Sequence, residues 1–506
     1  MISFILNNED ITTGLPPGMT VLDLVRYRKG LKGTKIGCRE GDCGACTILV
    51  GELLEGEVRY RSMTSCLMPL SNAAGKHIVT VEGINPEGGG LTMVQQAMVN
   101  ESGTQCGFCT VGFVMSLTGF CLSSRQGVTS PHAGNGKTLP DDLAISSIDG
   151  NICRCTGYKS IERAAAQICD RLKAGEQSAV PDYFAEIPAR LRAINESASI
   201  EETRSSGIAA FVGGGTDVYV QRPEEMAEQK AAPLLFDEHL RGIRDLDGAI
   251  EVGASVTVTD LLESPIMQSV FPNLYRHLKL VSSTPIRNMA TLAGNFVNAS
   301  PIGDMTVWFL ALDAEIDLLP GTQAPSPATS PRGVRTLSLR DFYLGYKQLA
   351  KKPDEMITAI RFKKPVGDHR FNFEKVCKRT YLDIATVNTA ISLRVGGPRV
   401  SSPHVSSPHV SKGSSGPSGA LTNVRASDTI IEAHVSAGGV APIPFYLKET
   451  SAFLKGKTVS EETMAAANEI MQSEISPISD VRGTQKYKRL LLRQLFKAHF
   501  VELFDL

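Results

Sequence analysis

The sequence predicts an α+β multidomain protein, and three observations point to this class. The chain has 506 residues, which at roughly 100–200 residues per domain corresponds to three or four domains. Short apolar strand-like runs alternate with segments of helical periodicity along most of its length. Ten of the eleven cysteines lie before residue 170, so the N-terminal third carries chemistry that the remainder lacks.

Composition and charge exclude several function classes. Lysine plus arginine (52) balance aspartate plus glutamate (53), so we expect no nucleic-acid binding and no membrane binding driven by bulk charge. No apolar run is long enough to cross a bilayer, and the opening MISFILNNED lacks the features of a secretory signal. We therefore expect a cytoplasmic protein, in which clustered cysteines indicate metal ligands or redox groups rather than disulfides.

Residues 1–88 are expected to form a first, mixed α/β unit. A strand over 2–6 meets a turn at Asn7-Asn8, and a helix is predicted over 20–29 with Thr20 as its N-cap. A glycine-rich loop over 37–46 then leads into a strand over 47–50.

Four cysteines of this unit have the spacing of a plant-type ferredoxin. Cys38, Cys43 and Cys46 fit C-x4-C-x2-C, and Cys66 follows them. Small residues between them allow backbone N–H groups to approach cluster sulfurs. The alternative is a four-cysteine zinc site, which usually uses two CxxC pairs instead. The spacing therefore predicts a 2Fe–2S cluster.

A second cysteine set lies within residues 89–174, where the periodicity becomes helical. Cys106 and Cys109 form a CxxC pair, and Cys153 and Cys155 a CxC pair followed by a last helix. Spacing alone leaves zinc, a redox pair and a second 2Fe–2S cluster open, and the position after a ferredoxin-like unit favours the cluster. Arg154 is expected to offset its negative charge.

The other cysteines and the remaining segments have plainer interpretations. Cys121 and Cys169 fall on apolar helix faces and are expected to be buried, and a core position is also expected for Cys377. Residues 175–195 read as a linker, 196–367 as alternating strands and helices, and 368–506 as a further α/β unit ending in an amphipathic helix over 484–503. Segments 320–332 and 396–419 are expected to be disordered loops, the second carrying His404 and His409 in a tandem repeat rather than in a metal site.

Two glycine-containing segments suggest a nucleotide site. Phe211 to Val218 reads as a strand entering a triple-glycine turn, where bare backbone could approach a pyrophosphate, although an ordinary tight turn is the alternative. Residues 284–304 are dense in hydroxyl, amide and glycine groups, which suit phosphates and ribityl hydroxyls.

Three motifs resemble the molybdenum hydroxylases, the xanthine dehydrogenase and aldehyde oxidase family: QCGFCTVGFVMSL (105–117), DGNICRCTGYKSI (149–161) and the segment 284–304. The resemblance implies a β-grasp plant-type ferredoxin domain (1–88), a four-helix 2Fe–2S domain (89–174), an α+β FAD-binding domain (196–367) and an α/β C-terminal domain of the CO dehydrogenase flavoprotein type (368–506). It implies that both cysteine sets bind 2Fe–2S clusters. It also implies FAD contacts at Phe211, Val212, Gly213, Gly214, Gly215, Thr216, Asp217, Val218, Thr291, Gly294, Asn295 and Asp304. Ile357 and Lys375 match later flavin-contacting positions, and the alternative is that they are ordinary strand and surface residues.

The functional implication of the resemblance is an electron relay and no general acid or base on this chain. The fused arrangement is similar to the small subunit of xanthine dehydrogenases, whose partner is a molybdopterin-binding large subunit in a dimer of heterodimers. Electrons from hypoxanthine or xanthine would pass through both clusters to FAD and then to NAD, although oxygen stays open as acceptor. The alternatives are the equivalent subunit of an aldehyde or N-heterocycle oxidoreductase and, from another class, a zinc-binding scaffold.

Overall fold

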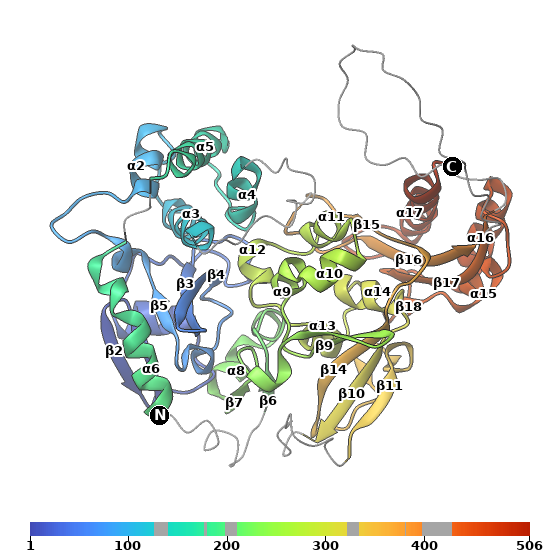
Figure 1. Ribbon diagram of the computed structural model, residues 1–506, viewed down its shortest axis with the longest axis horizontal. Helices are drawn as coiled ribbons and strands as arrows, with labels where there is room; N and C mark the ends of the chain where they lie inside the picture. The colour runs from blue at the N-terminus through green and yellow to red at the C-terminus, as the bar shows by residue number, and fades with distance from the viewer. Residues whose placement is uncertain (126–139, 177–179, 198–209, 321–332, 380, 397–427) are drawn as a thin grey trace, which may run out of the picture.

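The computed structural model describes residues 1–125, 140–176, 180–197, 210–320, 333–379, 381–396 and 428–506. The α+β multidomain prediction is confirmed: consecutive parts of the chain form a β-sheet domain, a helical domain, a mixed central domain and a C-terminal sheet with helices (Figure 1). No described helix is both long and apolar enough to cross a membrane. The predicted loops over 320–332 and 396–419, with His404 and His409, lie almost entirely outside the described residues.

The N-terminal domain has the predicted β-grasp sheet. Its strand order is β2-β1-β5-β3-β4, with β1 and β5 parallel and the other pairs antiparallel. The strands are β1 (Ile2–Leu6), β2 (Glu9–Thr13), β3 (Thr47–Leu54), β4 (Glu57–Thr64) and β5 (His77–Val79).

The helical segment of this domain begins as predicted and then widens. The Thr20 hydroxyl accepts a hydrogen bond from the N–H of Asp23 at 3.1 Å, which caps α1 (Val21–Asp23). From Leu24 to Arg28 the helix is a π-helix, a variant that hydrophobic spacing alone does not distinguish from an α-helix.

The next domain contains the four predicted helices: α2 (Met93–Asn100), α3 (Thr110–Arg125), α4 (Pro140–Ser147) and α5 (Lys159–Lys173). Helix α3 packs on β3 and β4, so one face of the ferredoxin sheet and the helical domain share a single apolar core. Cys121 and Cys169 are fully buried in that core, as predicted.

The segment expected to be a linker is partly helical. A 3₁₀ turn (Asp182–Ala185) is followed by α6 (Ile187–Ser197), and Tyr183, Ile187 and Leu191 are buried against the ferredoxin domain. These apolar positions are few, but they are spaced to lie on one side of the segment, and they anchor it.

The central domain combines a small parallel pair with a larger antiparallel sheet. Strands β6 (Ala210–Val212) and β7 (Ala231–Pro233) are parallel, and two short helices connect them, α7 (Val218–Gln221) and α8 (Pro223–Glu228). The larger sheet has the order β11-β10-β14-β9-β8. Its strands are β8 (Ile243–Leu246), β9 (Ala249–Gly253), β10 (Glu315–Pro320), β11 (Arg335–Ser338) and β14 (Glu355–Lys363), and its helices include α9 (Val258–Glu263), α11 (Leu274–Lys279), α12 (Thr284–Arg287), α13 (Leu292–Asn298) and α14 (Asp304–Leu310).

The described residues of the C-terminal domain form an antiparallel sheet of order β15-β16-β17-β18 and three helices. Helix α17 (Gln485–Phe504) is the predicted amphipathic helix, and Thr484 caps it. The other elements are β15 (Asp368–Val376), β16 (Val387–Gly396), β17 (Thr429–Gly438), β18 (Phe445–Tyr446), α15 (Lys448–Leu454) and α16 (Glu461–Glu474).

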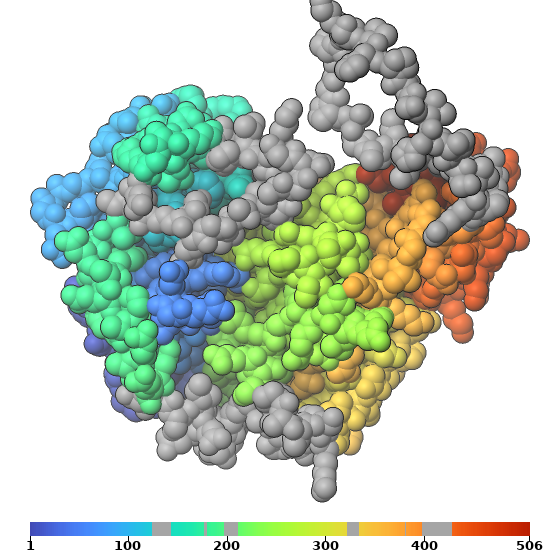
Figure 2. All heavy atoms as spheres, viewed as in Figure 1, coloured from blue at the N-terminus to red at the C-terminus, as the bar shows by residue number. Residues whose placement is uncertain are grey.

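The ferredoxin domain contacts both of its neighbours. The space-filling view shows its blue surface directly against the green central domain, with the orange and red C-terminal domain on the far side (Figure 2). Apolar side chains from the central domain, among them Val212, Tyr219 and Met289, belong to the same buried cluster as Cys46 and Cys66. The two cysteine sets and the glycine turn are therefore parts of one packed assembly.

Candidate functional site

The first cysteine set forms two pairs, with Cys38, Cys43 and Cys46 on the loop between the π-helix and β3 and Cys66 just after β4. Side-chain hydrogen bonds join Cys38 to Cys43 and Cys46 to Cys66. A Cβ on Gly37 would lie 2.6 Å from the sulfur of Cys43, and Gly41 and Gly44 have positive φ angles. The loop can follow this path because glycine occupies those positions.

Within each pair of the first set, the pKa of one thiol is lowered and that of the other is raised. The hydrogen bond from Cys43 lowers the pKa of Cys38 from 9.0 to about 5, and the same bond raises the pKa of Cys43. The pair of Cys46 and Cys66 behaves likewise: the mutual hydrogen bond lowers the pKa of Cys46 and raises that of Cys66. Thiolates are the form that binds iron.

The second set also forms two pairs. The sulfur of Cys155 lies 3.6 Å from that of Cys106, and Cys109 and Cys153 interact through a side-chain hydrogen bond. Cys106 and Cys155 are exposed, whereas Cys153 is buried. Arg154, expected to offset cluster charge, is exposed between them.

Two pairs of thiols are what a 2Fe–2S cluster requires, because it takes two cysteine thiolates on each iron. Each set places its four thiols in two such pairs. The ligand roles of the eight cysteines stay predictions.

The loops that carry the two sets touch each other through backbone. The N–H of Ile152 donates to the carbonyl of Cys43 at 3.0 Å, and the amide of Asn151 donates to the carbonyl of Gly44 at 3.1 Å. Ser116 donates in turn to the Asn151 side-chain oxygen at 2.7 Å. Asn151 is buried beside both loops; it lies within the motif over 149–161, but the sequence assigned it no role.

The triple-glycine turn lies against the first turn of α13 and the residues before it. A Cβ on Gly214 would lie 1.9 Å from the carbonyl oxygen of Met289, and one on Gly213 would lie 2.5 Å from the Thr291 hydroxyl. Among the described residues, the N–H groups of Gly214, Gly215 and Thr216 donate to no carbonyl or side chain. Bare, unpaired N–H groups on a tight turn fit a dinucleotide diphosphate.

The other predicted flavin contacts lie on α13, α14 and two strands. Thr291, which contacts the glycine turn at Gly213, caps α13 by accepting from Gly294 N–H at 3.2 Å. The Asn295 side chain accepts from Thr306 at 3.0 Å, and Asp304, in the same first turn of α14, pairs with Lys375 at 2.7 Å.

The Lys375 side chain is fully buried and also donates to the Leu280 carbonyl at 2.7 Å. Ile357 is buried in β14 opposite Leu318. Contact of these residues with flavin stays a prediction.

Burial raises the pKa of the Asp217 carboxyl in the glycine turn, and the nearby Lys347 charge opposes that shift.

Cys377 does not occupy the core position expected for it. The chain leaves the sheet at Val376, so the thiol is half-buried and donates to the Arg379 carbonyl at 2.8 Å.

The glycine turn also meets the ferredoxin domain at residues that sequence reasoning missed. A Cβ on Gly215 would lie 2.3 Å from the carbonyl of Leu67, the residue after Cys66. The buried amide of Asn72 donates to the carbonyl of Gly213 at 2.9 Å. Neither residue has a spacing signal, because each contact joins segments far apart in the sequence.

Comparison with protein-family models gives four consecutive matches. They are a 2Fe-2S iron-sulfur cluster binding domain (residues 4–71), a 2Fe-2S binding domain (80–166), an FAD binding domain in molybdopterin dehydrogenase (189–364) and a CO dehydrogenase flavoprotein C-terminal domain (417–503). The chain belongs to the molybdenum hydroxylase family. It comprises the iron–sulfur and FAD-binding, electron-transfer region of that family.

Curated proteins similar to this chain include xanthine dehydrogenases, and similar solved structures include a CO dehydrogenase and a quinoline oxidoreductase. Xanthine dehydrogenase 1 of Arabidopsis thaliana is 27% identical, with 96% of this chain matched to 38% of that protein; the xanthine dehydrogenase of Emericella nidulans is 27% identical, with 91% matched to 35%. The chain thus spans less than half of these relatives. Among structures, Cu,Mo-CO dehydrogenase has 24% identity and a TM-score of 0.47, covering 60% of this chain and 92% of that one. Quinoline 2-oxidoreductase from Pseudomonas putida 86 has 21% identity and a TM-score of 0.47, with the same coverage.

Proposed function

We propose that this molybdenum hydroxylase chain is the electron-transfer subunit of a cytoplasmic xanthine dehydrogenase. Electrons released by oxidation of hypoxanthine and xanthine to urate at a partner's molybdenum centre would cross the chain and leave to NAD. When bound, the two clusters and FAD supply the redox chemistry, while the residues of the chain hold them and set their spacing.

The observation that carries this proposal is the order of contacts between the three sites. The loop of Cys153 bonds to the loop of Cys43 through Ile152, and the residue after Cys66 packs on the glycine turn at Gly215. This sequence of contacts supports a path from the helical-domain cluster to the ferredoxin cluster and on to FAD.

The exposed side of the second cysteine set is where we place the molybdopterin-binding partner. Cys106 and Cys155 are exposed there, and so are three neighbouring apolar side chains, Phe108, Ile152 and Tyr158. An exposed apolar rim around a redox centre is suited to burial by another chain. We further propose a dimer of heterodimers for the assembly.

Xanthine as substrate is supported by the relatives, which are xanthine dehydrogenases over almost the whole of this chain. The test is to isolate the chain with its native partners and to measure NAD reduction with hypoxanthine or xanthine, and with an aldehyde and an N-heterocycle in parallel assays. Reduction of NAD by the purines is expected. Activity confined to the other substrates would assign the chain to a different hydroxylase. A colourless, zinc-containing chain would remove the relay altogether.

A further inference from the structure

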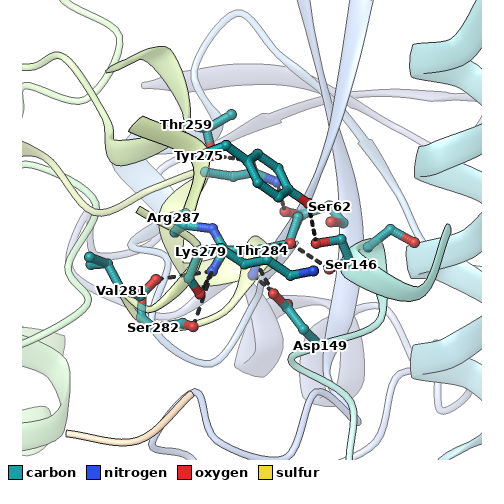
Figure 3. Close-up of polar contacts among 12 residues, drawn as sticks. Ser62, Ser146, Asp149, Thr259, Tyr275, Lys279, Val281, Ser282, Thr284 and Arg287 are labelled. Carbon is teal, nitrogen blue, oxygen red and sulfur yellow. Dashed lines mark hydrogen bonds and ion pairs between the residues drawn. The ribbon is translucent and has the colours of Figure 1, made fainter. Parts of the chain in front are cut away.

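A buried ion pair joins the helical domain to the FAD domain beside both cysteine sets. The Arg287 guanidinium lies 2.6 Å from the Asp149 carboxylate, and the two side chains are only 4% and 2% exposed. Figure 3 shows the pair at the centre of a polar network between the FAD domain and both cluster domains. A fully buried pair between two domains has a defined geometry, because water cannot replace either partner.

The Asp149 carboxylate is fully engaged by the FAD domain. Besides Arg287, it accepts a hydrogen bond from the N–H of Thr284 at 2.7 Å. The Thr284 hydroxyl donates to the Ser146 carbonyl at 2.8 Å, so the first turn of α12 is also bonded to the last turn of α4. A Cβ on Gly150 would lie 2.8 Å from the Ser283 hydroxyl, which shows how closely the two backbones approach.

The planar guanidinium of Arg287 donates hydrogen bonds in two directions at once. One nitrogen donates to Asp149 and Thr284, and the other donates to the carbonyls of Val281 at 3.0 Å and Ser282 at 3.1 Å. Lysine could not make these contacts together, because its ammonium group is a single point.

The residues on either side of this pair touch the predicted cofactor sites. Asn151, two positions after Asp149, bonds to the Gly44 carbonyl, and Cys153 follows. A Cβ on Gly41 would lie 2.8 Å from the side chain of Ile286, the residue before Arg287. Met289 contacts the glycine turn at Gly214. The pair therefore connects a segment adjoining both cysteine sets to a segment adjoining the predicted flavin site.

We propose that Asp149 and Arg287 are positioning residues that fix the separation of the flavin from the clusters. The inference rests on the proposed electron relay, and it assigns to this pair the spacing on which the relay depends. Neither residue contacts the reacting atoms. The pair acts through α12 and through the loop that precedes Cys153.

The test uses the full chain loaded with iron, sulfide and FAD. A single electron is injected photochemically, and its redistribution between the cluster and flavin absorbance bands is followed. Arg287→Met and Asp149→Asn remove the ion pair, and Arg287→Lys keeps the charge without the planar fork. Arg163→Met is the matched control, because Arg163 pairs with Glu101 within the helical domain and its side chain is 60% exposed.

We expect the transfer between clusters and flavin to slow by about tenfold or more in Arg287→Met, since small misplacements of reacting groups carry costs of that order. Asp149→Asn should slow it similarly, Arg287→Lys should be intermediate, and Arg163→Met should match the unmodified chain. Iron content, FAD content and the reduction potentials should stay unchanged, which separates positioning from loss of cofactor.

Three outcomes would overturn the assignment or its basis. Unchanged transfer in loaded Arg287→Met and Asp149→Asn would show that the pair does not set the spacing. Failure of both variants to retain their cofactors would make the pair a determinant of folding instead. If the unmodified loaded chain transferred no electron between clusters and flavin, the proposed function itself would be wrong.

Discussion

The backbone N–H of Ile152 donates a hydrogen bond to the carbonyl of Cys43 over 3.0 Å. Cys43 belongs to the first cysteine set, and Ile152 directly precedes Cys153 of the second. Cys43 and Cys153, 110 residues apart in sequence, are thus connected by one hydrogen bond and a few covalent bonds. Asn151 makes the neighbouring contact and offers a side chain through which this junction can be tested.

Replacing Asn151 with alanine should weaken the junction between the cluster domains. The change removes the bond to Gly44 and leaves the buried Ser116 hydroxyl without its acceptor, so we expect a loss of about 1–3 kcal/mol in the free energy of unfolding. Urea denaturation of the loaded chain measures this loss. Asn100→Ala, at an exposed position on α2, should change stability far less, and equal effects of the two variants would contradict the prediction.

A single cysteine substitution should remove one cluster and leave the other bound. Cys106→Ser is expected to abolish the second cluster and retain the first, so that about half of the iron stays bound, and Cys38→Ser should give the converse. Iron analysis and the visible and EPR spectra report the outcome. Cys377→Ser is the control, because this thiol belongs to neither cysteine set, and its substitution should leave all iron in place. Complete retention of iron in Cys106→Ser would contradict the ligand assignment.

The glycine turn should not tolerate a single methyl group at its centre. In Gly214→Ala the new Cβ would lie 1.9 Å from the Met289 carbonyl, so the turn or α13 must move, at a cost of about 1–3 kcal/mol in stability. We expect loss of FAD from the purified protein, measured by flavin absorbance. A Cβ at Gly90 would meet no atom within 4 Å, so Gly90→Ala should bind FAD normally. Normal FAD content in Gly214→Ala would place the diphosphate elsewhere.

Acid should weaken the attachment of the C-terminal domain to the FAD domain. The buried side chain of Asn372 bridges His277 at 3.1 Å and His499 at 3.0 Å. Burial lowers the pKa of His277 from 6.5 to about 4 and that of His499 from 6.5 to about 3. Between about pH 4 and 6.5 the unfolded chain therefore binds more protons, so stability rises with pH in this window and is lost as pH falls.

Equilibrium unfolding as a function of pH tests the histidine prediction. His499→Gln, which keeps an acceptor for Asn372, should flatten the pH dependence between pH 4 and 6.5. His239→Gln, at an exposed position, should leave it unchanged. An identical slope in the His499 variant and the unmodified chain would show that acid acts through other groups.

Features with local signals could be predicted from the sequence. The cysteine spacing, the Thr20 cap and the amphipathic helix beginning after Thr484 each depend on residues close together in the chain, and the structure contains the cap, the helix and thiols in pairs. Asp149, Asn151 and Arg287 lie within motifs that carry the family resemblance, but nothing in those motifs predicted the contacts that these side chains make. Asn72 lies in no motif. A solitary polar residue looks the same in a sequence whether it faces water or bridges two domains.

Helix α6 has a consequence for dividing the chain into separately produced pieces. Arg190 of this helix bonds to Asp10 at 2.7 Å and to Asn8 at 2.8 Å, and Leu191 is buried on the ferredoxin side. A cut near residue 175, or at residue 189 where the family-model match begins, would remove α6 or part of it from the N-terminal fragment and expose the sheet surface on which it packs. The other fragment would begin with apolar side chains that have lost their packing partners. Fragments intended for labelling, crystallisation or fusion should therefore be divided beyond Ser197.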